Sequence, residues 1–147
     1  MQDEKLGTIL NDLVKIHEAR IASYEKAQAA IESEDEKALF QQMMEDSKRI
    51  IAELHELMLA HQDEIEGEEG RVYRAWTAIR SQYVGNDRHT VFSFCEYGED
   101  TVQFAYSSAL HLPVIMPYRL REILSQQQDK LKESHDTIKS YRDVVHH

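Results

Sequence analysis

The chain has 147 residues, and its 27 acidic and 17 basic side chains give a formal net charge of −10 with histidine neutral. This acidic balance disfavours a nucleic acid or an anionic membrane as partner, because both are bound through clustered Lys and Arg. Five glycines and two prolines are few for a fold of strands and turns, so the composition favours long helices in one domain. Since Cys95 is the only cysteine, the start at Met1 lacks an apolar leader and no stretch approaches ~20 apolar residues, we expect a cytoplasmic protein that does not enter a membrane.

Apolar residues recur at steps of three and four in five segments, which is the spacing of amphipathic helices. The predicted helices, in chain order, cover residues 4–31, 34–65, 71–84, 87–111 and 117–145, and together they make a single domain over 4–145. Ser33 with Glu36 resembles an N-cap with its reciprocal acid, and Asp87 can cap the fourth helix. Pro117 suits the first turn of the fifth helix.

The negative charge is concentrated in the first half of the chain. Residues 1–70 hold 18 acidic and 7 basic side chains, whereas residues 71–112 hold 4 of each. The excess is greatest at 63–70, where two glycines among acidic residues indicate a solvated loop rather than a helix interior. We therefore expect the acidic residues to give a solvated surface, with the more neutral second half available to a partner.

The architecture follows from the lengths of these segments. Four long amphipathic helices bury their apolar stripes best in a four-helix bundle. The connection over residues 66–86 is long and contains a short helix of its own, so it can cross along the bundle, as in the ferritin-like arrangement. An up-down path with an excursion is the alternative.

A weak internal repeat supports the crossover. His17 and Tyr24 on the first helix are echoed by Glu99 and Tyr106 on the fourth, with the same spacing of seven residues. Each copy then reaches a helix break and is followed by a second helix. Two hairpins related in this way would form a bundle with approximate twofold symmetry.

Several short motifs carry a resemblance to a known family. These are Leu10-Asn11-Asp12-Leu13, Tyr24-Glu25-Lys26-Ala27, Cys95-Glu96-Tyr97-Gly98-Glu99-Asp100 and the pairs His135-Asp136 and Arg142-Asp143. On these residues the chain, from about Leu6 to Asp143, resembles a bacterial family of ferritin-like four-helix bundles, domain of unknown function 2383. The resemblance implies the fold and a distant relation to rubrerythrin and ferritin-like proteins, but it assigns no activity and no functional residue.

A ferritin-like relative raises the question of a di-iron or di-manganese centre. Such a centre needs Glu from two helices and Glu-x-x-His from the other two, and no Glu-x-x-His occurs in this sequence. The remaining candidate metal ligands are His17, Glu99 and His135, although His135 lies roughly 7 Å too far along the bundle axis at ~1.5 Å per residue. We favour polar core residues satisfied by their neighbours, for example His17 paired with Glu99, and we keep a degenerate Fe or Mn site as the alternative.

Other residues on the third and fourth helices indicate packing and association. A buried Cys95 beside a carboxylate should have a raised pKa and act as a packing residue. The small residues Gly98, Ala105 and Ala109 on one edge of the fourth helix favour a close approach of a neighbouring helix, and the alternative is that they leave an internal pocket. Trp76 and Phe104 lie on faces that the bundle need not bury, so a homo-oligomer is expected. The predicted function is a non-catalytic binding or scaffold module without a cofactor. The alternatives are a metal-dependent (Fe or Mn) oxidoreductase or iron-handling protein, and a sensor that holds a small apolar ligand beside Gly98.

Overall fold

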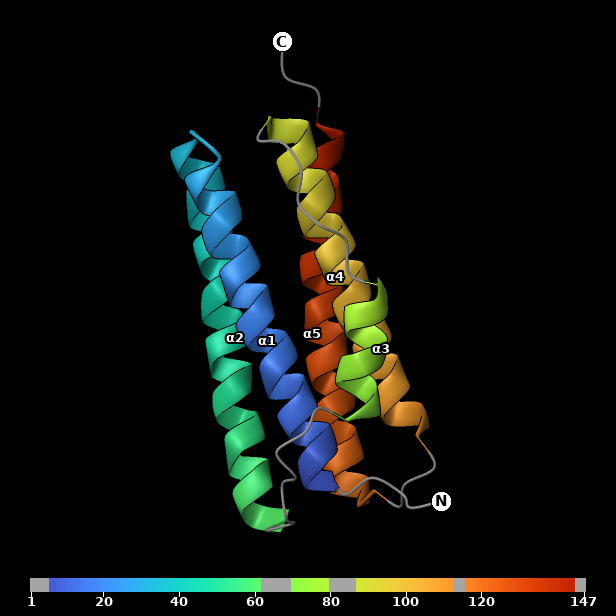
Figure 1. Ribbon diagram of the computed structural model, residues 1–147. Helices are drawn as coiled ribbons and strands as arrows, with labels where there is room; N and C mark the ends of the chain where they lie inside the picture. The colour runs from blue at the N-terminus through green and yellow to red at the C-terminus, as the bar shows by residue number, and fades with distance from the viewer. Residues whose placement is uncertain (1–5, 62–69, 80–86, 113–115, 145–147) are drawn as a thin grey trace.

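The computed structural model describes residues 6–61, 70–79, 87–112 and 116–144, and the helices within them are α1 (Leu6–Ala29), α2 (Glu34–His61), α3 (Arg71–Ile79), α4 (Arg88–His111) and α5 (Tyr118–Asp143) (Figure 1). The predicted all-helical fold is confirmed for these residues, and the helices begin and end within a few residues of the predicted bounds. The acidic loop at 63–69 and the predicted helix ends at 4–5, 62–65, 80–84 and 145 lie outside the described residues.

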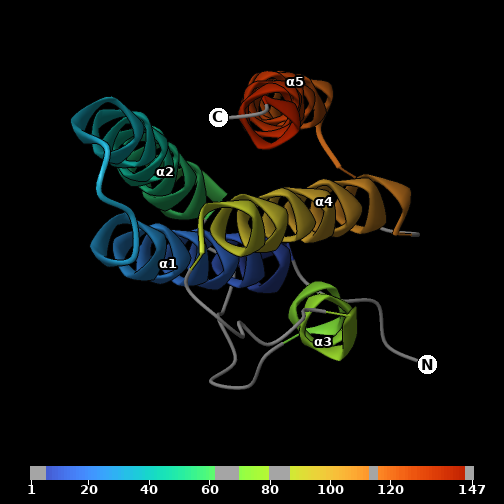
Figure 2. The same cartoon turned by 90° about the horizontal axis from the view of Figure 1, so that it is seen from above.

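The four long helices form two hairpins, α1 with α2 and α4 with α5. Figure 1 shows α1 and α5 running in one direction and α2 and α4 in the other, so α2 ends at the opposite end of the molecule from the start of α4. The connection between them therefore spans the length of the hairpins, as the crossover prediction requires. Seen from above, α1 and α4 lie in the middle, with α2 and α5 on one side and α3 on the other (Figure 2).

The predicted helix starts agree with the structure in part. The backbone N–H of Glu36 donates to the Ser33 hydroxyl at 3.3 Å, and the N–H of Thr90 donates to Asp87 at 3.1 Å. The carboxylate of Glu36 does not serve as the reciprocal acceptor at this helix start. It accepts a hydrogen bond from Arg88 of α4 at 2.7 Å instead. Pro117 is the N-cap residue of α5 rather than part of its first turn.

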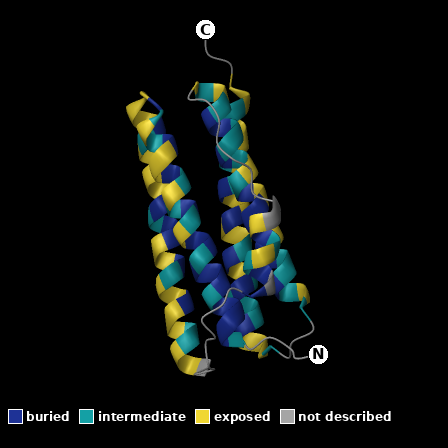
Figure 3. Ribbon diagram, viewed as in Figure 1, coloured by how far each residue is buried: buried dark blue, intermediate teal, exposed yellow. Residues whose placement is uncertain are grey.

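The apolar core runs along the inner faces of the long helices (Figure 3). It divides into two clusters of buried side chains, one near the start of α1 and one near its end. The first includes Leu10, Leu13, Leu54, Trp76, Ala105, Leu124 and Leu131, and the second includes Tyr24, Phe40, Met43, Val91, Phe92, Cys95 and Ile138. Polar side chains lie between them. None of the described helices is both long enough and apolar enough to cross a membrane.

The short helix α3 is fixed by a carboxylate from α1. The fully buried Asp12 accepts hydrogen bonds from the backbone N–H groups of Gly70 at 2.9 Å and Tyr73 at 3.2 Å, at the N-terminal end of α3. A carboxylate at this position satisfies N–H groups that have no partner within the helix. Asp12 belongs to one of the motifs that carried the family resemblance, and its role here is to dock the crossover onto the bundle.

The predicted exposure of Trp76 is wrong. Trp76 is only 5% exposed, because α3 packs across α1 and α4. The indole N–H of Trp76 donates to Thr101 of α4 at 3.1 Å. The second side of α4 is thus covered by the chain's own short helix. Phe104 remains 43% exposed, as predicted.

Candidate functional site

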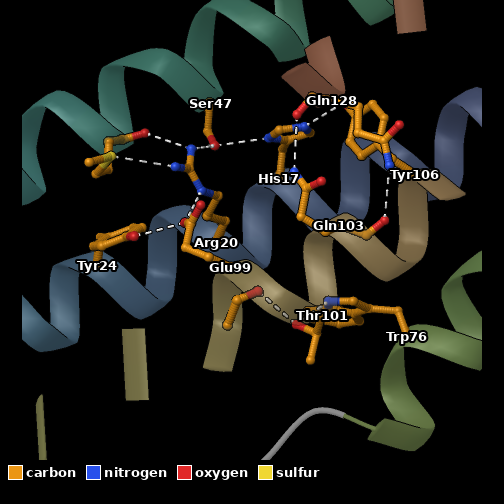
Figure 4. A network of polar contacts seen from close by, with 12 residues as sticks. His17, Arg20, Tyr24, Ser47, Trp76, Glu99, Thr101, Gln103, Tyr106 and Gln128 are labelled. Carbon is orange, nitrogen blue, oxygen red and sulfur yellow. Dashed lines mark hydrogen bonds and ion pairs between the residues drawn. The ribbon is translucent and has the colours of Figure 1, made fainter. Parts of the chain in front are cut away.

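A polar network lies in the middle of the hairpins and draws side chains from each of the four long helices (Figure 4). Its members are His17, Arg20 and Tyr24 of α1, Ser47 and Glu53 of α2, Glu99 and Tyr106 of α4, and Gln127 of α5. All of them except Glu53 are buried. Because buried polar groups are costly unless they are hydrogen-bonded, the partners of each group determine what this network can do.

One end of the network is an ion pair. Arg20 Nε donates to Glu99 Oε1 at 2.7 Å, and the Tyr24 hydroxyl donates to the same oxygen at 2.8 Å. Burial lowers the pKa of Arg20, but the Glu99 charge and the other groups around it outweigh burial and raise it above the ordinary value. The arginine is therefore permanently charged and fixes the position of the carboxylate.

Arg20 also connects α1 to α2. Its Nη1 donates to the Met43 backbone carbonyl at 3.0 Å and to the Ser47 hydroxyl at 2.7 Å, and its Nη2 contacts the Met43 sulfur at 3.6 Å. A guanidinium is suited to this position because it presents several donors in a fixed plane. This one side chain thus joins three helices.

At the other end of the network, the donor and the acceptor of each hydrogen bond can be assigned. Gln127 Nε2 donates to Glu53 at 3.2 Å, so Gln127 Oε1 is the atom that accepts from the Tyr106 hydroxyl at 2.8 Å. Because that hydroxyl has a single proton, His17 Nε2 must carry the proton in its 2.8 Å contact with Tyr106. The geometry therefore selects the Nε2–H tautomer of a neutral His17.

The remaining ring nitrogen agrees with this assignment. His17 Nδ1 is 2.9 Å from the Ser47 hydroxyl, which already accepts from Arg20 and so donates its own proton to Nδ1. Burial lowers the pKa of His17 from 6.5 to about 3, and the nearby Arg20 charge acts in the same direction. His17 is thus neutral near pH 7, and both of its nitrogens have partners.

Three further titratable groups at the site are held in their neutral forms. Burial raises the pKa of the Tyr24 and Tyr106 hydroxyls well above the ordinary value. Cys95 is buried in the second apolar cluster, which agrees with the predicted packing role. Burial and the Glu99 carboxylate raise the pKa of its thiol, so Glu99 rather than the adjacent Glu96 supplies the charge. None of the three is prepared to act as a nucleophile or base near pH 7.

The two copies of the internal repeat contact each other where α1 packs against α4. Tyr24 of α1 donates to Glu99 of α4, while Tyr106 of α4 bonds His17 of α1. Each polar residue of the repeat therefore pairs with the tyrosine of the other copy. This crosswise exchange corrects the predicted pairing of His17 with Glu99: the arginine one turn after His17 takes the carboxylate instead.

A pocket of about 550 Å³ lies beside this network on the side of α3. It is lined by α1 and α4, with Trp76 contributed by α3, and the lining includes Arg20, Tyr24, Gly98 and Glu99. A Cβ atom added at Gly98 would meet no atom within 4 Å, so the missing side chain leaves this part of the pocket open. The favoured prediction for Gly98, a close approach of a neighbouring helix, is therefore wrong, and the alternative of an open space agrees with the structure.

One carboxylate oxygen of Glu99 makes no hydrogen bond within the described residues. Its Oε1 has two donors, but its buried Oε2 has no hydrogen-bond partner within the described part of the chain. An unsatisfied buried acceptor costs about 1–3 kcal/mol. This atom is the feature of the network that its own side chains do not account for.

Replacing Gly98 with alanine is expected to raise the free energy of unfolding by about 0.5–1 kcal/mol. Glycine in a helix interior loses more backbone freedom on folding than alanine does, and the new methyl group meets no atom within 4 Å. Urea unfolding followed by circular dichroism measures this difference. A variant less stable than the parent would show that the space beside Gly98 is not open in solution.

The three predicted metal ligands have other partners in the structure. His17 bonds Ser47 and Tyr106, and Glu99 bonds Arg20 and Tyr24. His135 is partly exposed on α5, where its Nε2 lies 2.6 Å from an oxygen of Asp100. Within the described ranges, no three His, Cys, Asp or Glu side chains come together as a metal site would require.

The donor set around His17 and Glu99 also fits a metal poorly. A cation bound to Glu99 would lie beside the permanent charge of Arg20, which already occupies one carboxylate oxygen at 2.7 Å. The Fe or Mn site stays a prediction that elemental analysis of protein from Fe- and Mn-supplemented cells can test. We expect less than about one-tenth equivalent of either metal, whereas one equivalent that disappears in a His17→Ala variant would establish the site.

Sequence reasoning missed Arg20, the residue with the most contacts in the network. The signal was present, because Leu13, His17, Arg20 and Tyr24 are spaced 4, 3 and 4 along one helix face. Spacing alone does not predict a buried arginine, because arginine is rarely fully buried unless it is paired. The partner, Glu99, was itself singled out, but as a metal ligand.

The fold and the network define an all-helical protein with a polar core and an adjoining pocket. The chain matches the domain of unknown function DUF2383 over residues 5–112 and belongs to this family. The matched region ends short of Asp143 and thus contains α1 to α4 and the crossover but not α5. No curated protein and no solved structure gave a significant match.

Proposed function

We propose that this chain is a ferritin-like four-helix bundle that serves as a non-catalytic binding module for a small molecule. The helix directions and the long connection between α2 and α4 support the ferritin-like arrangement. The polar core supports binding over catalysis, because both ring nitrogens of His17 are bonded and Cys95 is held as a thiol. In this protein the polar positions of a ferritin-like core hold the helices together.

The observation that carries the proposal is the pocket beside Gly98. Its volume of about 550 Å³ falls within the range of small-molecule sites, which is about 300–1,000 Å³. Glycine in the interior of α4 costs stability, and here it leaves the pocket open without making room for a neighbouring helix. A pocket with an apolar lining and few polar groups is typical of a binding site.

Filling the pocket tests this function. Wild-type protein and a Gly98→Leu variant are purified from cells, denatured, and the released small molecules are identified by mass spectrometry. We expect the wild type to release a molecule in near-stoichiometric amount and Gly98→Leu to release none. Ala38→Leu, which adds bulk at an exposed position of α2, is the matched control and should behave as the wild type.

Two results would contradict the proposal. One is a wild-type protein from which no small molecule is released and to which none binds. The other is equal release from Gly98→Leu, provided that circular dichroism shows the variant to be folded, because the molecule would then occupy another place.

We also infer that the module self-associates through the exposed side of α4. Phe104 and Tyr97 lie seven residues apart on this helix and are 43% and 41% exposed. Large aromatic side chains on one helix face are typical of protein interfaces.

Replacing Phe104 with serine is expected to raise the dissociation constant of the homo-oligomer at least tenfold, because an interface loses an aromatic anchor. Sedimentation velocity over a range of concentrations gives the constant. Leu59→Ser on α2 is the control, since Leu59 is more exposed, at 72%, but lies on another helix. A wild type that is monomeric at all concentrations, or an equal effect of Leu59→Ser, would remove the inference.

A further inference from the structure

A groove of about 880 Å³ runs between α2 and α5. Figure 2 shows these two helices on the same side of α1 and α4, which is the side away from α3. Every residue that lines the groove belongs to α2 or α5, so no other described helix covers it. The lining includes two partly exposed apolar side chains, Leu57 of α2 and Ile123 of α5. This surface, called the α2–α5 groove below, is therefore open to a partner.

The two sides of the α2–α5 groove carry opposite charges. The charged residues of the lining are Asp46, Arg49, Glu53 and Glu56 of α2 and Arg119 and Lys130 of α5. Asp46 and Arg49 form an ion pair with each other, so the α2 side keeps the negative charge of its two glutamates, whereas the α5 side is positive. Glu53, Glu56 and Lys130 are exposed and form no ion pair with another described residue.

One hydrogen bond fixes the positions of these residues along the groove. Gln127 of α5 donates to Glu53 of α2 at 3.2 Å, so the two residues lie at the same level. Because α2 and α5 run in opposite directions (Figure 1), Leu57 and Ile123, each four residues nearer the same end, also share a level. Lys130 lies three residues beyond Gln127, which is about 4.5 Å along the axis at ~1.5 Å per residue. This offset is within the reach of a lysine and a glutamate side chain.

A second copy of the chain carries the matching surface. A twofold rotation about an axis parallel to the groove keeps every level and places the α2 side of one copy opposite the α5 side of the other. The glutamates of each copy then face the basic residues of its partner, and the Leu57 and Ile123 side chains of both copies form one apolar layer. Neighbouring helices are antiparallel throughout, as in a four-helix bundle. An axis across the groove would instead place glutamates against glutamates, which is unfavourable.

We propose that the α2–α5 groove is the interface of a symmetric dimer, in which Glu53 of each copy pairs with Lys130 of the other copy. A second copy is favoured over an unrelated protein because the two sides of the groove are already complementary to each other. Burial of the layer of Leu57 and Ile123 supplies stabilisation, and the charges select the orientation. The groove shares no lining residue with the pocket beside Gly98 and does not include Phe104, so this inference goes beyond the proposed function.

Reversing the charges of one side at a time tests the dimer. The full chain carries Phe104→Ser in every experiment, so that association through α4 does not contribute, and this parent should dimerise in sedimentation velocity. Glu53→Lys with Glu56→Lys makes both sides of the groove basic, whereas Arg119→Glu with Lys130→Glu makes both sides acidic. Each variant should have a dissociation constant at least about tenfold above that of the parent, because like charges then face each other.

An equimolar mixture of the two charge-reversed variants gives the sharpest result. One copy then has a wholly basic groove and the other a wholly acidic one, so a heterodimer should form with a dissociation constant close to that of the parent. Such a rescue shows that both variants are folded. Glu45→Lys on α2 and Lys132→Glu on α5 reverse charges outside the lining of the groove, and as matched controls they should dimerise like the parent.

Three results would overturn the proposal. A parent that stays monomeric at all concentrations would exclude the dimer and leave the groove to another partner. Undiminished association of either charge-reversed variant, or a mixture that stays monomeric, would exclude the pairing of the two sides. A loss in Glu45→Lys or Lys132→Glu as large as in the groove variants would assign the effect to net charge instead of to the groove.

Discussion

An Arg20→Met variant is expected to lose about 3–5 kcal/mol of the free energy of unfolding, the typical cost of removing one partner from a buried ion pair. The variant leaves the Glu99 carboxylate buried without its cation and removes the donor to Ser47 and to the Met43 carbonyl. Methionine fills part of the volume but replaces none of these bonds. Urea unfolding measures the loss, and a stability near that of the wild type would show that the pair contributes little.

Two controls separate charge from packing. Adding Glu99→Gln to Arg20→Met removes the unpaired charge, and this double variant should recover at least half of the loss. Lys48→Met is the matched single control, because the pair of Lys48 with Glu45 is 3.6 Å long and solvent-exposed, and such pairs contribute about 0–1 kcal/mol. A loss in Lys48→Met as large as in Arg20→Met would contradict the role of burial.

The sequence was sufficient for the helices because their signals are local. The apolar spacing and the caps at Ser33 and Asp87 depend on residues within one or two turns, and both caps are present in the structure. The length of one connection likewise allowed a crossover, with an up-down path as the alternative. These features require no knowledge of how the helices pack on one another.

The sequence predicted some members of the site but not their pairing, because the pairing depends on packing between distant helices. His17, Glu99 and the repeated tyrosines were all singled out from their spacing. Which of them meet depends on the register of α1 against α4, and a shift of one turn would separate both pairs. Arg20 illustrates the limit: its spacing placed it on the inner face, but only the position of Glu99 shows why it is stable there.

The crossover helix α3 shows a second limit of prediction from the sequence. An amphipathic segment predicts that α3 buries one face, but the surface it covers is set by Asp12, which lies 58 residues before Gly70 in the chain and accepts its N–H. The exposure of Trp76 was therefore predicted wrongly, while that of Phe104, which lies away from α3, was predicted correctly. The same docking brings Trp76 to the pocket.

His17 is expected to make the protein less stable as the pH falls from 6.5 toward 3. Its pKa is about 3 in the folded state, against 6.5 for an unperturbed histidine, so the unfolded chain binds the extra proton throughout this window. Stability from this group is complete above pH 6.5 and falls as the pH decreases. Between pH 7 and pH 5 the loss should reach about 2 kcal/mol.

A His17→Gln variant isolates this contribution, since glutamine can donate to Tyr106 and accept from Ser47 but cannot gain a proton. Carboxylates and the exposed histidines titrate in both proteins, so the difference between the two pH profiles belongs to His17. Urea unfolding at intervals between pH 4.5 and 7.5 provides the profiles. Parallel profiles would contradict the neutral, Nε2-protonated His17, because a histidine that can be protonated in the folded core loses no stability on acidification.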